Sequence, residues 1–400
     1  MKKITSAVLI ALMLCAFTGC EKTEISDSSD DISIQPISTP SSSTETSTVE
    51  SSQPEPEPQP ISMKMLCAGD NLLHINIINL AKRRGADDPS GYDFRPSYAA
   101  TADIVAAADL AILNQETIVT DKFTPSNYPL FCSPQAAGDQ MVELGFDVMS
   151  IGNNHVLDKG EAGLTATLEY WEENHPDIPV YGAAMKDDDE IPVLDVNGIT
   201  FAFVGFMEHT NGLSLPSDTD CRITYLSETE EVERQVKAAR ELADVVVVSA
   251  HYGIEVSNTV TQQQLSITRN LVDWGADIII GTQPHTVQPM EYVNKPDGGQ
   301  AFVFYCLGNY ISSMTSSPLA MVGMLGELTI TKNPDGSIIL ENPEAIPLIT
   351  HVNYTAGDVR QYLWEDYTEE LAAVHGTEGF SYALAERLVN EYVGIQDLLD

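Results

Sequence analysis

Residues 245–253 read VVVVSAHYG, an apolar and largely β-branched run of strand length that ends on a histidine, a tyrosine and a glycine. Such a run is typical of a strand that is covered on both faces of its sheet. Residues 277–281 (DIIIG) and 301–307 (AFVFYCL) have the same character. We therefore expect buried sheets, with polar residues placed directly after some of their strands.

The chain from residue 63 to about residue 313 alternates apolar strand-length runs with amphipathic helical stretches, which predicts an α/β protein. The dipeptide Asn197-Gly198 is a strong hairpin signal, and residues 227–230 and 261–264 read as capping boxes at helix starts. The predicted strands are 64–68, 110–113, 147–151, 192–196, 199–206, 245–250, 277–281 and 301–307, and the predicted helices are 72–84, 100–108, 139–144, 161–173, 227–243 and 262–274.

Beyond residue 314 the pattern changes. Residues 326–331 and 337–340 flank Asn-Pro-Asp-Gly, which predicts a small hairpin. Residues 358–400 look helical and polar. We expect a folded domain over residues 63–350 and a helical extension over residues 351–400.

The amino terminus has the features of an export signal. Lys2 and Lys3 precede an apolar run at 7–17, which is shorter than the about 20 residues that span a bilayer. Phe17-Thr18-Gly19-Cys20 resembles the lipobox of bacterial lipoproteins, in which the cysteine carries the lipid. We expect a lipoprotein signal peptide over residues 1–20, lipidation of Cys20 and anchoring at the outer face of the bacterial cell membrane. A plain signal peptide that is cut nearby is the alternative.

Residues 21–62 consist mainly of Ser, Thr, Pro, Glu and Asp, with almost no large apolar side chain. Such a stretch cannot bury enough apolar surface to offset the entropy that ordering costs. We expect a disordered acidic tether that gives the folded part its reach.

The chain carries 20 basic and 59 acidic residues, a formal net charge of −39. Nucleic-acid binding needs a basic footprint, so this balance excludes nucleic-acid partners. It also argues against adhesion to anionic lipid through basic patches. The hydrophobic content of 43% is enough for a sizeable core.

Cysteine usage fits export only loosely. Cys67 and Cys306 lie in apolar strand-like runs and are expected to be core residues. Cys132 and Cys221 lie in loop-like sequence and could pair, but the spacing does not decide this. The chain has no Cys-x-x-Cys motif, which argues against a structural zinc site.

Polar residues collect directly after the predicted strands. Because the carboxyl ends of parallel strands meet at one edge of a sheet, we expect these residues to converge there. Imidazole, carboxylate and amide oxygen are ligands that suit a divalent metal such as Zn, Mn or Fe. The residues concerned are Asp70, Asn114, Glu116, Asn153, Asn154, His155, His251, Gln283, His285 and Asn309.

Each of these residues also has an ordinary structural explanation. Asp70 could cap a helix, Glu116 could solvate a loop, and Asn153-Asn154 could be turn residues. His155 and His251 could be hydrogen-bonded core histidines, and residues 283–285 could form a rigid turn. Their joint placement at the ends of separate strands favours a site.

These motifs resemble those of the bacterial capsule-synthesis CapA family, which is associated with poly-γ-glutamate capsules. The resemblance covers residues 63 to about 313. The motifs that carry it are Ala68-Gly69-Asp70, Asn114-Gln115-Glu116, Gly152-Asn153-Asn154-His155 with Asp158 and Gly160, His251-Tyr252-Gly253-Ile254-Glu255, Gly275-Ala276-Asp277, Gly281-Thr282-Gln283-Pro284-His285, Gln288-Pro289 and Tyr305-Cys306-Leu307-Gly308-Asn309-Tyr310.

The resemblance implies a metallophosphoesterase-like four-layer α/β/β/α sandwich with a metal centre at one edge. It assigns Asp70 and His285 to one metal, Asn154 and His251 to a second, and Glu116 to the bridging position. His155 would be the catalytic histidine that stabilises charge on the substrate or protonates a leaving group. Further metal or substrate candidates are Asn114, Asn153, Gln283, Glu255 and Asn309. Glu208 and His209 are second-rank candidates for the same rim, and a surface loop is their alternative.

The sequence departs from the family pattern at two positions. The Asp-x-His of ordinary metallophosphoesterases is absent, because Asp70 is followed by Asn71 and Leu72. Gln283 stands where the family has a histidine, and an amide binds transition metals more weakly than imidazole does. We therefore expect one or two divalent ions, of Mn, Zn, Fe or Mg.

Three functions are compatible with these features. The first is a metal-dependent hydrolase or transferase that acts on a phosphoester or on the γ-glutamyl amide of a capsule polymer. The second is a non-catalytic factor that binds or tethers an anionic capsule or cell-wall polymer, with a vestigial metal site. An acidic body repels such a polymer except where a metal reverses the field, which favours docking at a metal-loaded cleft. An exported solute-binding protein is the third, but it does not explain the order of the motifs.

Overall fold

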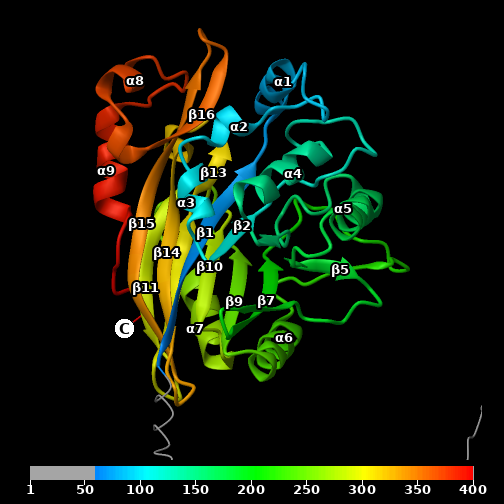
Figure 1. Cartoon of the computed structure of the whole chain (residues 1–400), viewed down its shortest axis with the longest axis vertical. Coiled ribbons are helices and arrows are strands. Elements are labelled where there is room, and N and C mark those ends of the chain that lie inside the picture. The colour runs from blue at the N-terminus through cyan, green and yellow to red at the C-terminus, as the bar shows by residue number, and fades with distance from the viewer. Residues whose placement is uncertain (1–58, 400) are drawn as a thin grey trace, which may run out of the picture. The chain divides into compact units, whose positions relative to one another are not determined.

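Two large β-sheets pack face to face in the computed structural model, which describes residues 59–399 (Figure 1). The predicted signal peptide and residues 21–58 of the predicted tether lie outside the described residues. The first strand begins at Ile61, two residues before the predicted start of the folded part.

The first sheet has eight strands, in the order β16-β15-β14-β1-β2-β3-β4, with β13 also paired to β1. Strands β1 to β4 and β13 pair in parallel, whereas β14 to β16 are antiparallel. The carboxyl ends of β1, β2 and β3 therefore lie at one edge. The bounds are β1 (Ile61–Leu72), β2 (Leu110–Asn114), β3 (Val148–Ser150), β4 (Val180–Tyr181), β13 (Asn309–Ser312), β14 (Val322–Lys332), β15 (Ile338–Asn353) and β16 (Asp358–Leu363).

The second sheet has six strands, in the order β11-β12-β10-β9-β7-β6. Its four central strands are parallel and its two edge strands are antiparallel to their neighbours. A separate two-stranded ribbon joins β5 (Ala183–Met185) to β8 (Cys221–Ile223). The bounds in the second sheet are β6 (Val193–Val196), β7 (Ile199–Met207), β9 (Val245–His251), β10 (Ile278–Thr282), β11 (Val287–Asn294) and β12 (Gln300–Leu307).

Strand β9 shows why its sequence is apolar without interruption. Val245 and Val247 belong to the core between the two sheets. Val246 and Val248 belong to a second core, which also contains Val236 of α6 and Leu271 of α7. Successive side chains of a strand point to opposite faces, so both sets are buried and neither face can be polar.

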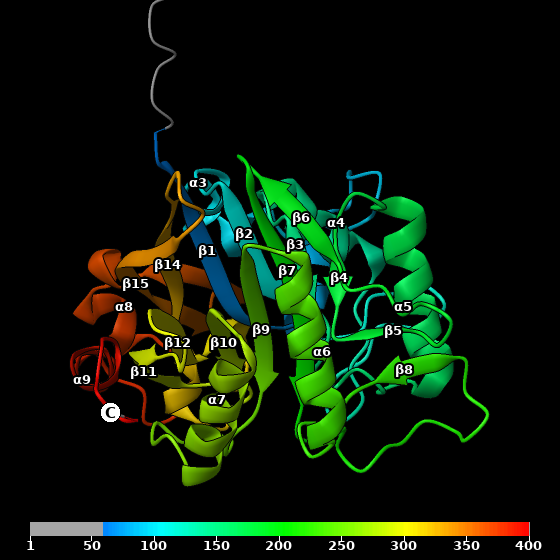
Figure 2. The same cartoon turned by 90° about the horizontal axis from the view of Figure 1, so that it is seen from below.

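Helices cover both outer faces and complete the predicted four layers. Helices α6 and α7 pack on the second sheet (Figure 2), and residues of α1, α3 and α4 join the core of the first. Among residues 59–399, we find no helix with the length and apolar character that crossing a membrane requires. The bounds are α1 (Ile75–Arg84), α2 (Arg95–Tyr98), α3 (Ala102–Ala106), α4 (Gln135–Leu144), α5 (Gly160–Asn174), α6 (Thr229–Leu242), α7 (Gln262–Trp274), α8 (Glu369–Ala373) and α9 (Tyr382–Tyr392), with single 3-10 turns at Pro318–Met321 and Trp364–Asp366.

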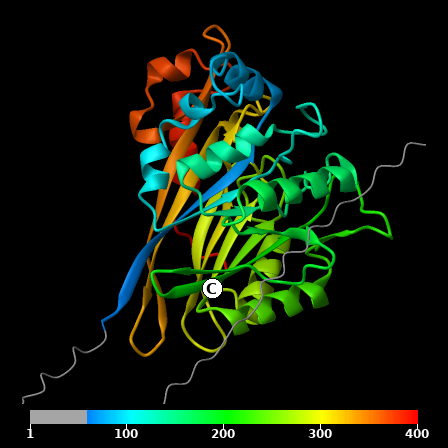
Figure 3. The same ribbon diagram turned by 45° about the vertical axis from the view of Figure 1, so that its right-hand side comes forward.

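The hairpin after residue 314 is larger than predicted and belongs to the first sheet. Strand β14 pairs with β1 from Ile61 to Ala68 and with β15 on its other side (Figure 3). The prediction of helix from residue 358 is wrong for β16, which pairs with β15. Residues 358–400 look helical and polar in sequence, yet Gln361 of β16 is buried and donates to the Tyr310 carbonyl oxygen.

The structure confirms one of the two predicted capping boxes and contradicts the other. The capping box at Thr261 is present, with reciprocal hydrogen bonds of 3.0 and 3.1 Å to Gln264. The predicted box at residues 227–230 is wrong, because α6 begins at Thr229 and its N-cap residue Glu228 makes no capping hydrogen bond from its side chain to the helix. The Glu228 carboxylate instead accepts from the Tyr225 backbone N–H at 2.7 Å.

A close backbone contact fixes the end of β1. The Asp70 N–H donates to the Gly308 carbonyl oxygen at 3.0 Å. A Cβ on Gly69 would lie 1.9 Å from that oxygen, so only glycine fits there. This contact links β1 to the turn before β13 and places the Asp70 side chain.

We predict that Gly69→Ala lowers the free energy of unfolding by about 1–3 kcal/mol, because the added methyl group forces β1 away from the Gly308 carbonyl. Chemical denaturation followed by circular dichroism measures this change. An unchanged unfolding midpoint would contradict the close contact.

Candidate metal centre

The strands of both sheets deliver side chains to one place. Asp70 lies near the end of β1, Glu116 two residues after β2, and Asn154 in the loop after β3. His251 is the last residue of β9, and His285 follows β10 by three residues. All five side chains are buried, with exposed fractions of 0–2%. The candidate centre therefore lies where the carboxyl ends of the two sheets meet.

Asp70, Glu116 and His285 form the tightest part of this cluster. One ligand atom from each lies within 4.8 Å of the other two. His285 Nδ1 is 3.0 Å from Asp70 Oδ2, and His285 Nε2 is 3.7 Å from Glu116 Oε1. Two carboxylates and an imidazole at this separation can hold a divalent metal ion.

His251 also lies close to Glu116, and Asn154 lies beside His251. His251 Nε2 is 3.9 Å from Glu116 Oε1 and 3.2 Å from Asn154 Oδ1. Both histidines thus approach the same oxygen of Glu116. The structure brings together all five residues that the resemblance assigns to metal, and their role as metal ligands stays a prediction.

Three asparagines surround Asp70. Asn114 Nδ2 donates to Asp70 Oδ1 at 2.7 Å, and Asn153 Nδ2 lies 3.4 Å from Asn114 Oδ1. Asn309 pairs with Asp70 in the sheet register, and its Oδ1 is 3.2 Å from His285 Nδ1. These amides position the candidate ligands.

Gln283 and His285 have backbone φ angles of +98° and +57°, a region that non-glycine residues seldom adopt. Strain of this kind persists where the surrounding structure enforces it, often at a functional site. The Gln283 Oε1 atom is buried and has no hydrogen-bond partner among the described residues. The Gln283 oxygen is therefore an unbonded acceptor two residues from His285, at the position where the resemblance implies an imidazole.

His155 lies beside the cluster and is oriented by a carboxylate. Its Nδ1 is 2.8 Å from Asp158 Oδ2, and the Phe131 ring packs edge-on against it with centroids 4.8 Å apart. The same Asp158 oxygen accepts the Phe131 backbone N–H at 2.5 Å. This arrangement fixes the ring and leaves Nε2 for proton transfer.

The remaining candidates lie further out. Glu255 is exposed, and its charge raises the pKa of Glu116 and of His285. Glu208 Oε2 accepts the Gly253 N–H at 3.0 Å, which holds the loop after β9. His209 is exposed, and its Nδ1 accepts the Asn211 N–H at 3.4 Å. These three residues therefore lie at the periphery of the candidate metal centre.

Two residues that support the cluster were not singled out from the sequence as site residues. Thr282 Oγ1 lies 2.9 Å from His251 Nδ1, which orients that ring. Asn211 Nδ2 donates to the Asn154 backbone oxygen at 3.2 Å. Thr282 lies inside a motif that carries the resemblance, whereas no sequence signal marks Asn211.

Burial and mutual charge shift the pKa values of the acidic groups in opposite directions. Burial raises the pKa of Glu116 well above its usual value, and the neighbouring Asp70 charge adds to this. Burial alone would also raise the pKa of Asp70, but the hydrogen bond and charge of His285 lower it overall. The environment therefore favours the ionised form of Asp70 and opposes ionisation of Glu116.

The pKa values of the two histidines also shift in opposite directions. Burial opposes charge on His285, yet Glu116 and Asp70 raise its pKa to about 10. Burial lowers the pKa of His251 to about 3. His251 is thus the neutral imidazole that a metal needs, and His285 carries a proton that a metal would displace.

The surroundings of the Glu116 carboxylate show whether the site suits a cation. Both of its oxygens are buried, and neither has a hydrogen-bond partner within the described part of the chain. Buried carboxylates that lack partners are costly unless a cation compensates them. The donor set of carboxylates, imidazoles and amide oxygens suits a divalent ion, so the residues present fit the metal that the fold implies.

Two stacked sheets with outer helices and a carboxylate–imidazole cluster at the strand ends define a metallophosphoesterase-like protein. The chain belongs to the bacterial capsule synthesis protein family PGA_cap, whose model matches residues 64–314.

Two curated relatives show the same likeness. The chain is 33% identical over 180 residues to the PGA biosynthesis protein CapA of Bacillus subtilis (strain 168), which covers 42% of this chain and 43% of that protein. It is 30% identical over 178 residues to the capsule biosynthesis protein CapA of Bacillus anthracis, which covers 42% of this chain and 41% of that protein. The matches thus span less than half the length of each relative.

Among solved structures, the chain is similar to the NAD nucleotidase of Haemophilus influenzae, with 12% identity, 84% of this chain and 60% of that chain covered, and a TM-score of 0.45. A putative 5'-nucleotidase of Staphylococcus aureus shows 15% identity, covers 72% of this chain and 54% of that chain, and has a TM-score of 0.43.

We predict that Glu116→Gln weakens binding of Mn²⁺ by more than the about 10- to 100-fold that loss of an outer partner of a metal ligand costs. The metal-free variant should be about as stable as the unchanged protein, because the Glu116 oxygens accept no hydrogen bond from the described residues that the substitution would remove. Isothermal titration calorimetry and thermal melts measure both quantities. Glu341→Gln, at an exposed position of β15, is the matched control. Equal Mn²⁺ affinity in both variants would remove Glu116 from the site.

We predict that Mn²⁺ binding releases protons and strengthens as the pH rises from about 6 to about 8, because the metal must displace protons held by His285 and Glu116. Calorimetry in two buffers of different ionisation enthalpy measures the number of protons released. An affinity independent of pH, with the same heat in both buffers, would contradict the charge assignment.

Proposed function

We propose that the protein is a lipid-anchored factor at the outer face of the bacterial cell membrane that acts in the synthesis or attachment of an anionic capsule polymer. Family membership and the CapA relatives support a role in capsule biosynthesis. The lipobox-like residues before Cys20 and the acidic stretch after it support the anchoring. Poly-γ-glutamate is the polymer that the family association favours.

We propose that the reaction is a metal-dependent hydrolysis or transfer. The observation that carries this proposal is the buried Glu116 carboxylate, which accepts no hydrogen bond from the described residues and has Nε2 of His285 and of His251 at 3.7 and 3.9 Å from its Oε1. An apolar residue would pack better at this position than a buried carboxylate that accepts no hydrogen bond. A bound cation would use it.

In this proposal Asp70, Glu116 and His285 would hold the first ion, and His251 with Asn154 would complete a second position. A bound divalent ion supplies positive charge that neutralises an anionic substrate and makes water nucleophilic near neutral pH. Thr282 keeps His251 in place through Nδ1 and so directs Nε2 toward Glu116.

His155 has the proton-transfer role. Its Nδ1 is held by Asp158, which fixes the orientation of the ring. The opposite nitrogen, Nε2, would protonate the leaving group of a phosphoester or of a γ-glutamyl amide.

Net charge limits where a polyanion can bind. The formal charge of −39 repels an anionic polymer over most of the surface. A cation at the candidate centre reverses the field locally, so the polymer would dock there and not across a broad face.

A non-catalytic binding or tethering factor is the second candidate. Two observations favour it: Gln283 replaces an expected imidazole, and the five predicted metal ligands are no more than 2% exposed. Such a site could keep a structural ion without reacting.

An assay of substrate turnover distinguishes the metal-dependent enzyme from the non-catalytic factor. We predict that the purified protein with added Mn²⁺ hydrolyses a chromogenic phosphodiester, bis-(p-nitrophenyl) phosphate, and that His251→Ala reduces kcat by at least about 100-fold through loss of a metal position. Glu341→Gln should retain full activity. Unchanged activity in His251→Ala would overturn the assigned role. Stoichiometric Mn²⁺ binding without turnover of this ester or of a γ-glutamyl anilide would favour the tethering factor.

A further inference from the structure

A chain of buried hydrogen bonds lies next to the candidate metal centre. The Tyr98 hydroxyl donates to Asn71 Oδ1 at 2.7 Å, and Asn71 Nδ2 donates to Gln115 Oε1 at 2.7 Å. Gln115 Nε2 donates in turn to the backbone oxygen and the Oγ1 atom of Thr117, at 2.9 and 3.0 Å. Tyr98, Asn71 and Gln115 are no more than 1% exposed. We call the hydrogen bond between the two amide side chains the Asn71–Gln115 clamp.

The clamp joins the chain neighbours of two predicted metal ligands. Asn71 directly follows Asp70 in β1. Gln115 directly precedes Glu116 in the loop after β2. The Asp70 carboxylate contacts a histidine that follows a strand of the second sheet, whereas the Asn71 side chain contacts Tyr98 of α2. The clamp therefore ties together the two backbones that carry the carboxylates without occupying the metal position.

Backbone pairing alone does not hold these two carboxylates together. The ladder between β1 and β2 ends at the pair of Asp70 and Asn114, after a register shift. Glu116 lies two residues beyond this last pair, so no ladder hydrogen bond between β1 and β2 fixes its distance from Asp70. The Asn71–Gln115 clamp is a side-chain link between the two segments at the point where their pairing stops.

The clamp is built from groups that are costly to bury unless they are hydrogen-bonded. The oxygen and the nitrogen of each amide both have a partner, so the network is satisfied on both residues. Apolar side chains could fill the same space, but their contacts are not directional. A satisfied polar network makes its surroundings rigid, and outer partners of this kind orient the ligands of metal sites.

We propose that Asn71 and Gln115 are positioning residues for the metal centre. Their clamp sets the separation at which a single ion can contact both Asp70 and Glu116, and Tyr98 holds its far end. This inference rests on the proposed function, because it requires a divalent ion at these carboxylates.

Calorimetry with Mn²⁺ on the purified full chain tests the proposal. Gln115→Met keeps the length of the side chain and removes both amide hydrogen bonds, so it should weaken Mn²⁺ binding by about 10- to 100-fold. Tyr98→Phe removes only the hydroxyl that donates to Asn71 and should weaken binding by about two- to fivefold. The visible absorption spectrum of bound Co²⁺, which reports coordination geometry, should shift in Gln115→Met. A loss of stability alone would not shift it.

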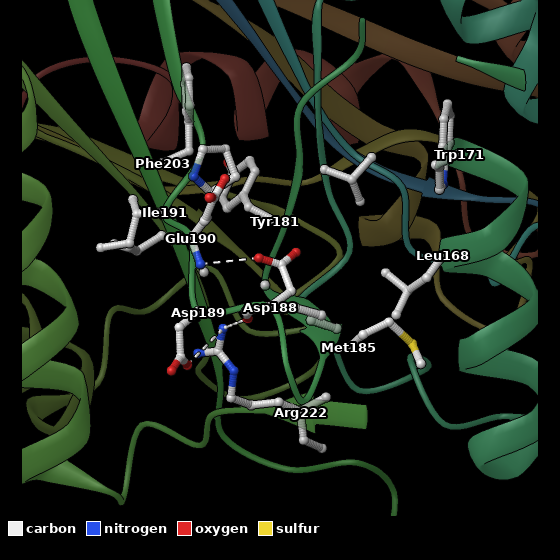
Figure 4. Close-up of a pocket in the computed structure, with 18 of the residues that line it drawn as sticks. Leu168, Trp171, Tyr181, Met185, Asp188, Asp189, Glu190, Ile191, Phe203 and Arg222 are labelled. Carbon is white, nitrogen blue, oxygen red and sulfur yellow. Dashed lines mark hydrogen bonds and ion pairs between the residues drawn. The ribbon is translucent and has the colours of Figure 1, made fainter. Parts of the chain in front are cut away.

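Two control variants change buried aromatic residues outside the clamp. Tyr170→Phe removes a hydroxyl that donates to Asp139 Oδ1 at 2.8 Å. Trp171→Phe removes packing at the wall of a cavity of about 700 Å³ beside β4, and none of the residues that line this cavity belongs to the clamp (Figure 4). Both variants should keep the Mn²⁺ affinity of the unchanged protein, even where their melting temperatures fall.

The outcomes separate this inference from the proposed function. An Mn²⁺ affinity and a Co²⁺ spectrum in Gln115→Met equal to those of the unchanged protein would overturn the positioning role and leave the metal centre in place. Absence of Mn²⁺ binding by the unchanged protein would overturn the proposed metal centre, and the positioning role with it. Should Gln115→Met fail to fold by circular dichroism, Tyr98→Phe decides, and an affinity equal to that of Tyr170→Phe would then overturn the proposal.

Discussion

The burial of two carboxylates next to each other is the constraint on which the rest of this structure depends. Asp70 and Glu116 are 0–1% exposed, and His285 and Asn114 are among the side chains next to them. Water cannot compensate their charge, so the protein must bind protons or a cation there. The opposite pKa shifts of the two carboxylates, and the raised pKa of His285, are consequences of this one requirement.

The arrangement of the two sheets places imidazoles next to the buried carboxylates. Two mainly parallel sheets, each covered on both faces, bring their carboxyl ends to a common edge. Asp70 and Glu116 come from the first sheet, and His251 and His285 come from the second. Neither sheet alone would supply both carboxylates and imidazoles. The packing of the two sheets through an apolar core therefore determines the geometry of the candidate metal centre.

The sequence predicted the buried strands well, because an uninterrupted apolar run such as residues 245–250 identifies a strand without tertiary information. Strand β11 was missed, since Gln288 and Glu291 interrupt its pattern. Both are buried, and Gln264 and Tyr305 satisfy them across the fold. For the site, strand ends and family resemblance selected the residues. The distances between them, and the contact of Asn309 with His285, depend on sheet packing and could not be predicted from one chain.

Anomalous diffraction from a crystal grown with Mn²⁺ tests the central claim most directly. The account predicts an anomalous peak within coordination distance of Asp70, Glu116 and His285, with the Glu116 carboxylate as a ligand. A well-ordered cluster without anomalous density at saturating Mn²⁺, or a peak bound by other side chains only, would contradict it.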